Sequence, residues 1–232
     1  MGNLYIVATP IGNLQDITLR AMDTLSFVDF LLCEDVRTTS NLLNFINKRL
    51  ENEGKKPRLI PLYEGNEVKV ISEVILALKN DSNIAIVSDA GTPTISDPGF
   101  KLVRECIKEG IKVMSIPGPT SLISALVSSG LPTDKFLFMG FLPKKQGHKK
   151  TTLENIKKSL KLINSTVIIF ESPHRIIATL EEIKEEFGDI EIVVARELTK
   201  IHEEIRKDLI SNQISHYKKG IKGEIVLLFN LK

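Results

Sequence analysis

The 232-residue sequence lacks several features that mark common classes of protein. It has no tryptophan, only two cysteines, and no hydrophobic run near the roughly 18 residues that a membrane-spanning helix needs. Cys33 and Cys106 match no disulfide or metal-ligand spacing, and the four histidines do not share the spacing of zinc ligands. No basic and hydrophobic leader opens the chain. We therefore expect a chain of the reducing cytoplasm, with no metal site and no membrane segment.

The glycine-rich motifs that hold nucleotides are also missing. Gly12 is the only glycine in the turn after the first expected strand, so the G-x-G-x-x-G fingerprint is absent. No Gly-Lys-Ser/Thr triplet closes a P-loop, and Ser172 lacks the glycines that surround a hydrolase nucleophile. These absences argue against binding of NAD through a dinucleotide fingerprint, against binding of ATP through a P-loop, and against a serine hydrolase.

What the sequence does contain is an alternation of short hydrophobic runs and helical patterns. We expect strands at 4–8, 30–34, 58–62, 84–88 and 112–116, and helices at 18–28, 36–47, 67–79, 98–109 and about 120–129. This order predicts an α/β fold with a mostly parallel sheet and right-handed crossovers.

The second half has a different pattern. Strands are expected at 136–139, 166–170, 190–195 and 224–230, and helices at 151–162 and 176–187. Pro117-Gly118-Pro119 interrupts the regular alternation, so we place a domain change there. The prediction is an N-terminal α/β domain at 1–116 with a mostly parallel sheet and a C-terminal α/β domain at 117–232 with a mixed sheet. A cleft between the two domains is expected.

Residues 88–99 are the most informative segment. They follow the buried run 84–87 and contain two glycines, two prolines and two aspartates, with no large side chain except Ile95. Asp97 and Pro98 suit the N-cap and first position of the next helix. That role leaves Asp89-Ala90-Gly91-Thr92-Pro93 unexplained. A rigid turn at the end of a buried strand is where open α/β sheets bind ligands.

Five other polar turns follow expected strands. They are Thr9-Pro10-Ile11-Gly12-Asn13, Glu34-Asp35-Val36-Arg37-Thr38-Thr39, Pro117-Gly118-Pro119-Thr120-Ser121, Glu171-Ser172-Pro173-His174-Arg175 and Arg196-Glu197-Leu198-Thr199. The carboxyl ends of parallel strands meet at one edge of a sheet, so we expect all six turns to lie along one edge and to form a site.

Positive charge is concentrated between residues 144 and 161. That segment has seven lysines and one acid, Glu154, in a chain of net charge +2. Such a concentration is typical of phosphate contacts, so we expect RNA binding by Lys144, Lys145, Lys149 and Lys150. A solvated lysine face is the alternative. A second basic group, at positions 218, 219 and 222, fits either interpretation.

Several long motifs together resemble one family. They are Leu4-Tyr5-Ile6-Val7-Ala8-Thr9-Pro10-Ile11-Gly12-Asn13-Leu14, Glu34-Asp35-Val36-Arg37, residues 88–99, Ile116-Pro117-Gly118-Pro119, Gly140-Phe141-Leu142-Pro143, Glu171-Ser172-Pro173-His174-Arg175, Ala195-Arg196-Glu197-Leu198-Thr199-Lys200 and Lys222-Gly223-Glu224. In this order they resemble the signature of a ribosomal RNA methyltransferase family. That family belongs to the tetrapyrrole-methylase superfamily, the class III fold of S-adenosylmethionine (AdoMet) methyltransferases. One stretch departs from it: Tyr63-Glu64-Gly65-Asn66-Glu67 stands where the family has two histidines, so no role of those histidines carries over.

The resemblance implies two α/β/α domains with AdoMet bound in the cleft between them. Matched residue by residue, the cofactor contacts are Pro10, Asp89, Gly91, Thr92, Thr120, Ser121, Phe170, Ala195 and Gly223. It also implies 2′-O-methylation of a cytidine in the decoding region of 16S rRNA and a homodimer. Because the chain has one strong basic region, three tyrosines and no tryptophan, we expect the RNA to be recognised within the small ribosomal subunit rather than as naked RNA.

Transfer to a 2′-hydroxyl requires alignment of oxygen, methyl and sulfur and, preferably, removal of the hydroxyl proton. The candidate catalytic residues are Glu34, Asp35, Arg37, Arg196 and Glu197, with structural ion pairs as the alternative role. Two other functions remain open. One is a C-methyltransferase acting on a tetrapyrrole such as a precorrin, and the other is a non-catalytic RNA- or nucleotide-binding relative.

Overall fold

The computed structural model describes residues 1–51, 56–63 and 65–231. Its contacts divide the chain into two units, Met1–Thr120 and Ser121–Lys232. The division falls a few residues after the expected boundary at 116. The reason is that Thr92 Oγ1 donates to Pro119 O at 3.3 Å, which holds the 117–119 turn on the first unit. Glu64, which belongs to the stretch 63–67 that differs from the family motif, lies outside the described residues.

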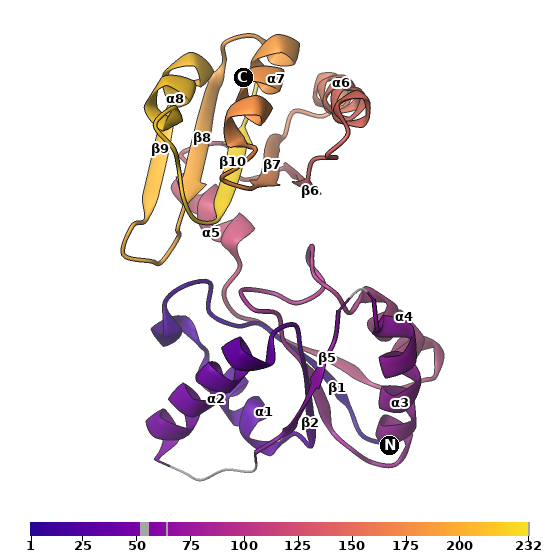
Figure 1. Cartoon of the computed structure of the whole chain (residues 1–232). Coiled ribbons are helices and arrows are strands. Elements are labelled where there is room, and N and C mark those ends of the chain that lie inside the picture. The colour runs from indigo at the N-terminus through magenta and orange to yellow at the C-terminus, as the bar shows by residue number, and fades with distance from the viewer. Residues whose placement is uncertain (52–55, 64, 232) are drawn as a thin grey trace. The chain divides into compact units, whose positions relative to one another are not determined.

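The first unit is a parallel α/β sheet with helices on both faces (Figure 1). Its elements are β1 (Leu4–Val7), the 3-10 helix η1 (Leu14–Asp16), α1 (Leu19–Phe27), β2 (Phe30–Cys33), α2 (Val36–Leu50), β3 (Arg58–Pro61), α3 (Glu67–Lys79), β4 (Ile84–Ile86), α4 (Phe100–Lys108) and β5 (Val113–Ile116). The strand order is β3-β2-β4-β1-β5, and every pairing is parallel. The mostly parallel N-terminal sheet is confirmed.

Two hydrophobic clusters lie on opposite faces of this sheet. One joins α1 and α2 to the strands through residues such as Leu25, Leu42 and Ala85. The other joins α3 and α4 through Val74, Leu102 and similar residues. Burial on both faces explains why β4 reads as a continuous hydrophobic run rather than an alternating one.

The second unit has a mixed sheet. Its elements are α5 (Ser121–Ser128), β6 (Phe136–Phe141), α6 (Gln146–Leu162), β7 (Thr166–Glu171), α7 (Ile176–Phe187), β8 (Glu191–Arg196), β9 (Glu204–Leu209), α8 (Ile210–Tyr217) and β10 (Ile225–Phe229). The strand order is β6-β7-β10-β8-β9, with β10 antiparallel to both neighbours. β7 and β8 therefore run in the same direction. The mixed C-terminal sheet is also confirmed.

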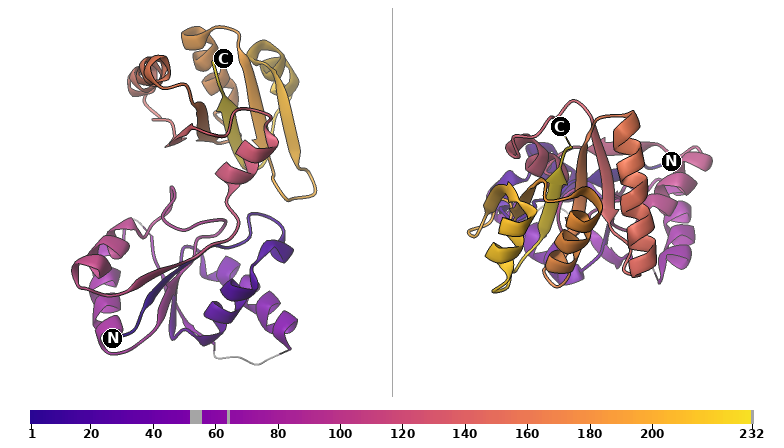
Figure 2. Two further views of the ribbon diagram at one scale, coloured as in Figure 1. Left: turned by 180° about the vertical axis from the view of Figure 1, so that it is seen from behind. Right: turned by 90° about the horizontal axis from the view of Figure 1, so that it is seen from above.

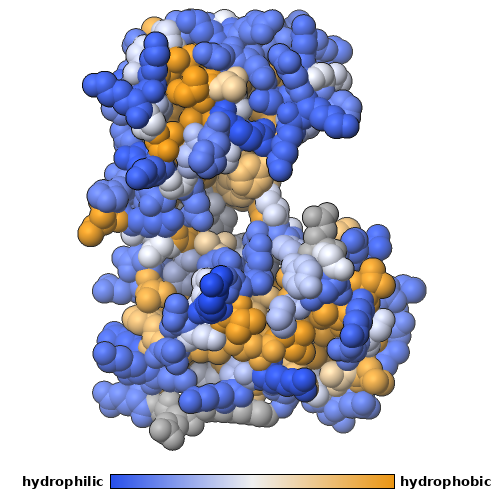
Figure 3. All heavy atoms as spheres, in the orientation of Figure 1, coloured by the Kyte–Doolittle hydropathy of each residue, from blue (hydrophilic) through white to orange (hydrophobic). Residues whose placement is uncertain are grey.

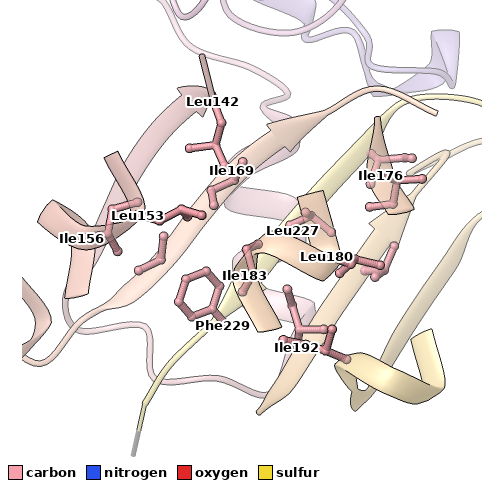
Figure 4. Packing of buried hydrophobic residues seen from close by; sticks show 14 of the residues in the cluster. Leu142, Leu153, Ile156, Ile169, Ile176, Leu180, Ile183, Ile192, Leu227 and Phe229 are labelled. Carbon is pink, nitrogen blue, oxygen red and sulfur yellow. The ribbon is translucent and has the colours of Figure 1, made fainter. Parts of the chain in front are cut away.

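Helices α6, α7 and α8 cover one face of the second sheet, and α5 contacts β10 on the other (Figure 2). Figure 4 shows the packing between the helices and the sheet, where Leu153, Ile183 and Phe229 interdigitate. Within the described chain, no helix is long and hydrophobic enough to cross a membrane.

Three local expectations are wrong. Asp97 and Pro98 do not begin α4, because Gly99 at φ +118° is its N-cap and Phe100 its first residue. Helix α6 begins at Gln146 rather than Thr151, since a buried contact of Lys149 holds its first turns. β9 and α8 were not expected. β9 is an edge strand whose residues alternate between exposed and half-buried and are mostly charged, so its hydrophobic pattern is weak.

Candidate functional site

The turns after β1 and β4 meet at the carboxyl edge of the first sheet. These strands are neighbours, but the chain leaves β1 toward β2 on one side and leaves β4 toward β5 on the other. Open α/β sheets bind ligands where the connections of two neighbouring strands lead in opposite directions. A backbone bridge joins the turns: Thr9 N donates to Gly91 O at 2.8 Å, and Gly91 N donates to Thr9 O at 3.1 Å.

Hydroxyl groups fix the backbone of the turn after β4. Thr9 Oγ1 donates to Ser88 O at 3.1 Å, and Ser88 Oγ donates to Gly91 O at 3.3 Å. Thr92, an expected cofactor contact, directs its hydroxyl proton at Pro119 O, so its oxygen is left with acceptor capacity only. The turn is thus held in place by its own side chains.

Left-handed backbone is concentrated in the same segment. Gly91 has φ +83°, Thr94 +73°, Ser96 +66° and Gly99 +118°. A Cβ added at Gly91 would lie 3.3 Å from Ile11 Cγ2, so the position is tight as well as left-handed. Threonine and serine rarely adopt this conformation, and such strain collects at ligand-binding turns.

Three carboxylates gather where β2 and β4 end. Asp89 Oδ1 accepts a hydrogen bond from Asp35 N at 3.1 Å. Burial, followed by the nearby charge of Asp89, raises the pKa of Glu34 above its ordinary value. Burial also raises the pKa of Asp89, although the Asp35 amide opposes that shift. Both groups would be stabilised in their ionised form by a cation.

Asp35 and Arg37 have a visible structural role. Asp35 Oδ1 accepts from Arg37 N at 2.7 Å and so caps α2, and its other oxygen pairs with Arg37 Nη2 at 2.9 Å. The side-chain hydrogen bond with Arg37 lowers the pKa of Asp35. The ion pair is exposed, with the Arg37 side chain 90% accessible, so it contributes little to stability and leaves the guanidinium free to contact an anion.

At the edge of the second sheet, Glu197 closes a turn on Gly223. Glu197 Oε1 accepts from Lys200 Nζ at 2.9 Å and from Glu224 N at 3.1 Å. A Cβ at Gly223 would lie 2.2 Å from Glu197 Cδ. The hydrogen bond from Lys200 lowers the pKa of Glu197, which keeps it ionised. Gly223 has φ +90°, which disfavours any side chain there, and a side chain would also displace the Glu197 carboxylate.

Arg196, the other candidate in this turn, is also engaged. Its Nε pairs with Glu204 Oε2 at 2.6 Å, and Nη1 donates to Lys222 O at 3.4 Å. Arg196 and Glu197 thus both form ion pairs within the unit, as expected if their role is structural.

The expected RNA-binding lysines fall into two kinds. Lys144, Lys145 and Lys150 are exposed. Lys149 is only 5% exposed, and its Nζ lies 2.9 Å from Glu182 Oε2 on α7. The charge of Lys149 is thus buried and paired with an acid, unlike the charges of the other three lysines. Hydrophilic residues cover the part of the surface where α6 lies (Figure 3).

The remaining expected cofactor residues are placed as follows. Pro10 is buried in the turn after β1, and Thr120 and Ser121 are half-buried where the two units join in sequence. Phe170 stacks edge-on with Phe138 at a centroid distance of 4.9 Å, and Ala195 is fully buried on β8. No group of three or more potential ligand side chains suited to a metal occurs in the described residues.

The expectation of six turns along one sheet edge is wrong. Four of them follow β1, β2, β4 and β5 of the first sheet, whereas the turns after β7 and β8 belong to the second sheet. The division into two sheets, which the change of pattern after residue 116 predicted, itself separates the last two turns from the first four.

Comparison of the sequence with known protein families identifies its family. The profile of the tetrapyrrole (corrin/porphyrin) methylases matches residues 3–212. The chain belongs to this family. It is 47% identical over 233 residues to the ribosomal RNA small subunit methyltransferase I of Thermotoga maritima, with 100% of both chains covered. The protein of that name from Hydrogenobaculum sp. is 46% identical, with 98% of this chain and 95% of the relative covered. That from Haemophilus influenzae is 45% identical, with 98% and 78% covered.

Solved structures of tetrapyrrole methylases share the fold. A diphthine synthase aligns with TM-score 0.74 at 15% identity, covering 99% of this chain and 90% of its own. The methyltransferase CobJ aligns with TM-score 0.70 at 14% identity, covering 99% and 95%. At these identities the likeness concerns the fold alone.

The chain also contains polar residues that the sequence did not single out. Thr179 and Glu182 on α7 face Lys149 on α6. Their spacing of three residues places them on one helix face, which was a usable signal. Nothing in the sequence identified their partner.

Proposed function

We propose that this chain transfers a methyl group from AdoMet to the ribose 2′-oxygen of a cytidine in small-subunit ribosomal RNA. The observation that carries the proposal is the 47% identity, over the whole of both chains, to a relative named ribosomal RNA small subunit methyltransferase I. We also propose that it acts in the cytoplasm as a homodimer on 16S rRNA within the small ribosomal subunit.

Asp89 and the turn that follows it are the proposed cofactor-binding centre of the first unit. AdoMet has an ammonium group and a sulfonium, and a partly desolvated carboxylate suits either cation. The left-handed backbone at Gly91 lets main-chain groups approach a ligand without an intervening side chain. Pro10, Thr92, Thr120, Ser121, Phe170, Ala195 and Gly223 remain proposed contacts.

Among the candidate catalytic residues, Glu34 fits proton removal best. Its raised pKa makes it a stronger base than an ordinary carboxylate. Arg37 would position phosphate, and Asp35 would hold Arg37. Arg196 and Glu197 would keep the turn after β8 in shape through their contacts with Glu204 and Glu224. When the 2′-oxygen bonds to the methyl carbon, the carbon–sulfur bond breaks and the hydroxyl proton leaves.

The start of α6 is the proposed RNA contact. The helix begins after Lys145, has no side-chain cap, and has no acid in its first turn. The positive end of the helix and the exposed charges of Lys144, Lys145 and Lys150 therefore repel one another. Phosphate groups bound there would relieve that repulsion.

Replacing Lys144, Lys145 and Lys150 together with glutamine is expected to weaken RNA binding and to leave AdoMet affinity unchanged. Each lost phosphate contact should flatten the plot of log affinity against log salt by about 0.7 to 0.9. Titrations of small-subunit RNA at several salt concentrations measure the slope.

The matched control replaces Lys48, Lys69 and Lys112, which are exposed on the first unit, with glutamine. It removes the same charge and should keep the slope of the unaltered chain. Equal slopes for the two triple variants would assign the α6 lysines to ordinary solvated surface.

The proposed reaction is tested by supplying radiolabelled AdoMet with small ribosomal subunits, naked small-subunit RNA and a tetrapyrrole precursor in parallel. We expect label in the RNA, most strongly in the assembled particle. Label in the tetrapyrrole alone would favour the C-methyltransferase. Absence of label from all three would favour a non-catalytic binding protein.

A further inference from the structure

The segment 142–149 is attached to α7 at both of its ends. At one end, Arg175 Nη2 at the start of α7 donates to Leu142 O at 2.8 Å. At the other, Lys149 Nζ lies 2.9 Å from Glu182 Oε2 and 3.5 Å from Thr179 Oγ1. The Leu142 side chain is buried in the core of the second unit, as Figure 4 shows.

One buried carboxylate links the two attachment points. The Glu171 side chain is fully buried; its Oε1 lies 3.4 Å from Arg175 Nε, and its Oε2 accepts from Thr179 Oγ1 at 2.6 Å. Arg175 and Glu171 thus form one pair of opposite charges, Lys149 and Glu182 form another, and the neutral hydroxyl of Thr179 joins the two. Each buried charge has a partner of opposite sign, so the set avoids the cost of an unpaired buried ion.

Between the attachment points lie the exposed lysines 144 and 145, and Lys150 follows directly. A buried ion pair seldom adds much stability relative to hydrophobic side chains of similar size. It does fix geometry, because Lys149 Nζ is held from two sides, by the Glu182 carboxylate and by the Thr179 hydroxyl. The main effect of this network is therefore to fix the positions of the exposed lysines.

We propose that Arg175, Glu171, Thr179 and Glu182 form a clamp that holds segment 142–149 in place for RNA, and that Lys149 is a positioning residue of this clamp. The inference rests on the proposed RNA-modifying function and deepens it. It assigns the phosphate-contacting role to the exposed lysines 144, 145 and 150, and a role in their preorganisation to Lys149.

The direction in which Glu182→Gln changes RNA affinity distinguishes this role of Lys149 from direct contact with phosphate. If Lys149 left Glu182 to bind phosphate, Glu182→Gln would free the lysine, remove a negative charge and strengthen RNA binding. If Lys149 is part of the clamp, Glu182→Gln weakens its anchor, and RNA binding falls although the chain has become more positive.

We expect Glu182→Gln to weaken binding of small-subunit RNA by roughly fivefold to tenfold, as for coupled groups in one network, with an unchanged salt slope. Glu181→Gln is the matched control, because it removes an exposed acid from the same helix and should bind RNA at least as well as the unaltered chain. Lys149→Arg, which keeps the charge, should bind better than Lys149→Met. Lys149→Met should keep the slope of the unaltered chain.

Hydrogen exchange on the full chain without RNA tests the clamp separately from the function. Amides of residues 144–150 should exchange faster in Glu182→Gln than in Glu181→Gln. Stronger RNA binding by Glu182→Gln, or a flatter slope for Lys149→Met, would overturn the clamp. If the exchange result holds and the unaltered chain does not bind RNA, the proposed function fails and the RNA role of the clamp fails with it. If Glu182→Gln does not fold, the slope of Lys149→Met decides.

Discussion

Gly91→Val is expected to abolish measurable AdoMet binding, a loss of more than a hundredfold. Gly91 has φ +83°, and its added Cβ would already lie 3.3 Å from Ile11 Cγ2. A branched side chain there strains the backbone by roughly 1–3 kcal/mol and disturbs the bridge to Thr9. Calorimetry with S-adenosylhomocysteine measures the affinity, and thermal melting measures the cost in stability.

Gly110→Val is the control for backbone strain alone. Gly110 has a similar φ of +69°, but no atom lies within 4 Å of its added Cβ. It should lower the melting temperature while leaving the affinity for the cofactor unchanged. If the two variants bind S-adenosylhomocysteine equally well, the turn after β4 is not part of the site.

Asp89→Ala is expected to weaken AdoMet binding by roughly tenfold to a hundredfold, because a hydrogen bond to a charged group contributes about 1.5–3 kcal/mol. The fold should persist. Burial raises the pKa of Asp89, so its ionised form is less favourable in the folded chain than in the unfolded chain, and replacing Asp89 removes that difference. Isothermal titration gives the affinity and melting gives the stability. Asp81→Asn, at an exposed pair with the N-terminus, is the control.

The proposed role of Asp89 also predicts that AdoMet affinity depends on pH. In the unaltered chain, AdoMet affinity should fall as the pH is lowered through the pKa of Asp89, which burial raises above the ordinary value of an aspartate, because the protonated carboxyl no longer attracts a cation. Asp89→Asn should be weak at every pH and lack this decline. An unchanged decline in the variant would assign the titration to another group.

Much of the fold could be predicted because its central strands, such as β4, β7 and β10, are almost entirely buried. The run at β4 and the helices at 67–79 and 176–187 follow directly from hydrophobic periodicity, and both helices have those bounds in the structure. β9 could not be predicted in this way. It pairs on one side only, so its six residues show charge rather than a hydrophobic face.

The candidate site was predictable in composition but not in arrangement. Asp89 and Gly91 stood out because a rigid polar turn follows a hydrophobic run. Their meeting with Asp35 and Thr9 depends on β4 lying between β2 and β1, which no local pattern encodes. The burial of Lys149 could not be predicted for a similar reason. Its partner Glu182 is far along the chain, so the lysine could not be distinguished by sequence from its exposed neighbours.

The position of the methyl group tests the central proposal most directly. Small-subunit RNA labelled by the unaltered chain would be hydrolysed with alkali and its products separated. A methylated 2′-oxygen cannot attack the adjacent phosphate, so we expect the label in a dinucleotide that resists alkali and contains cytidine. Label recovered only in alkali-sensitive mononucleotides would place the methyl group on a base and contradict the 2′-O assignment.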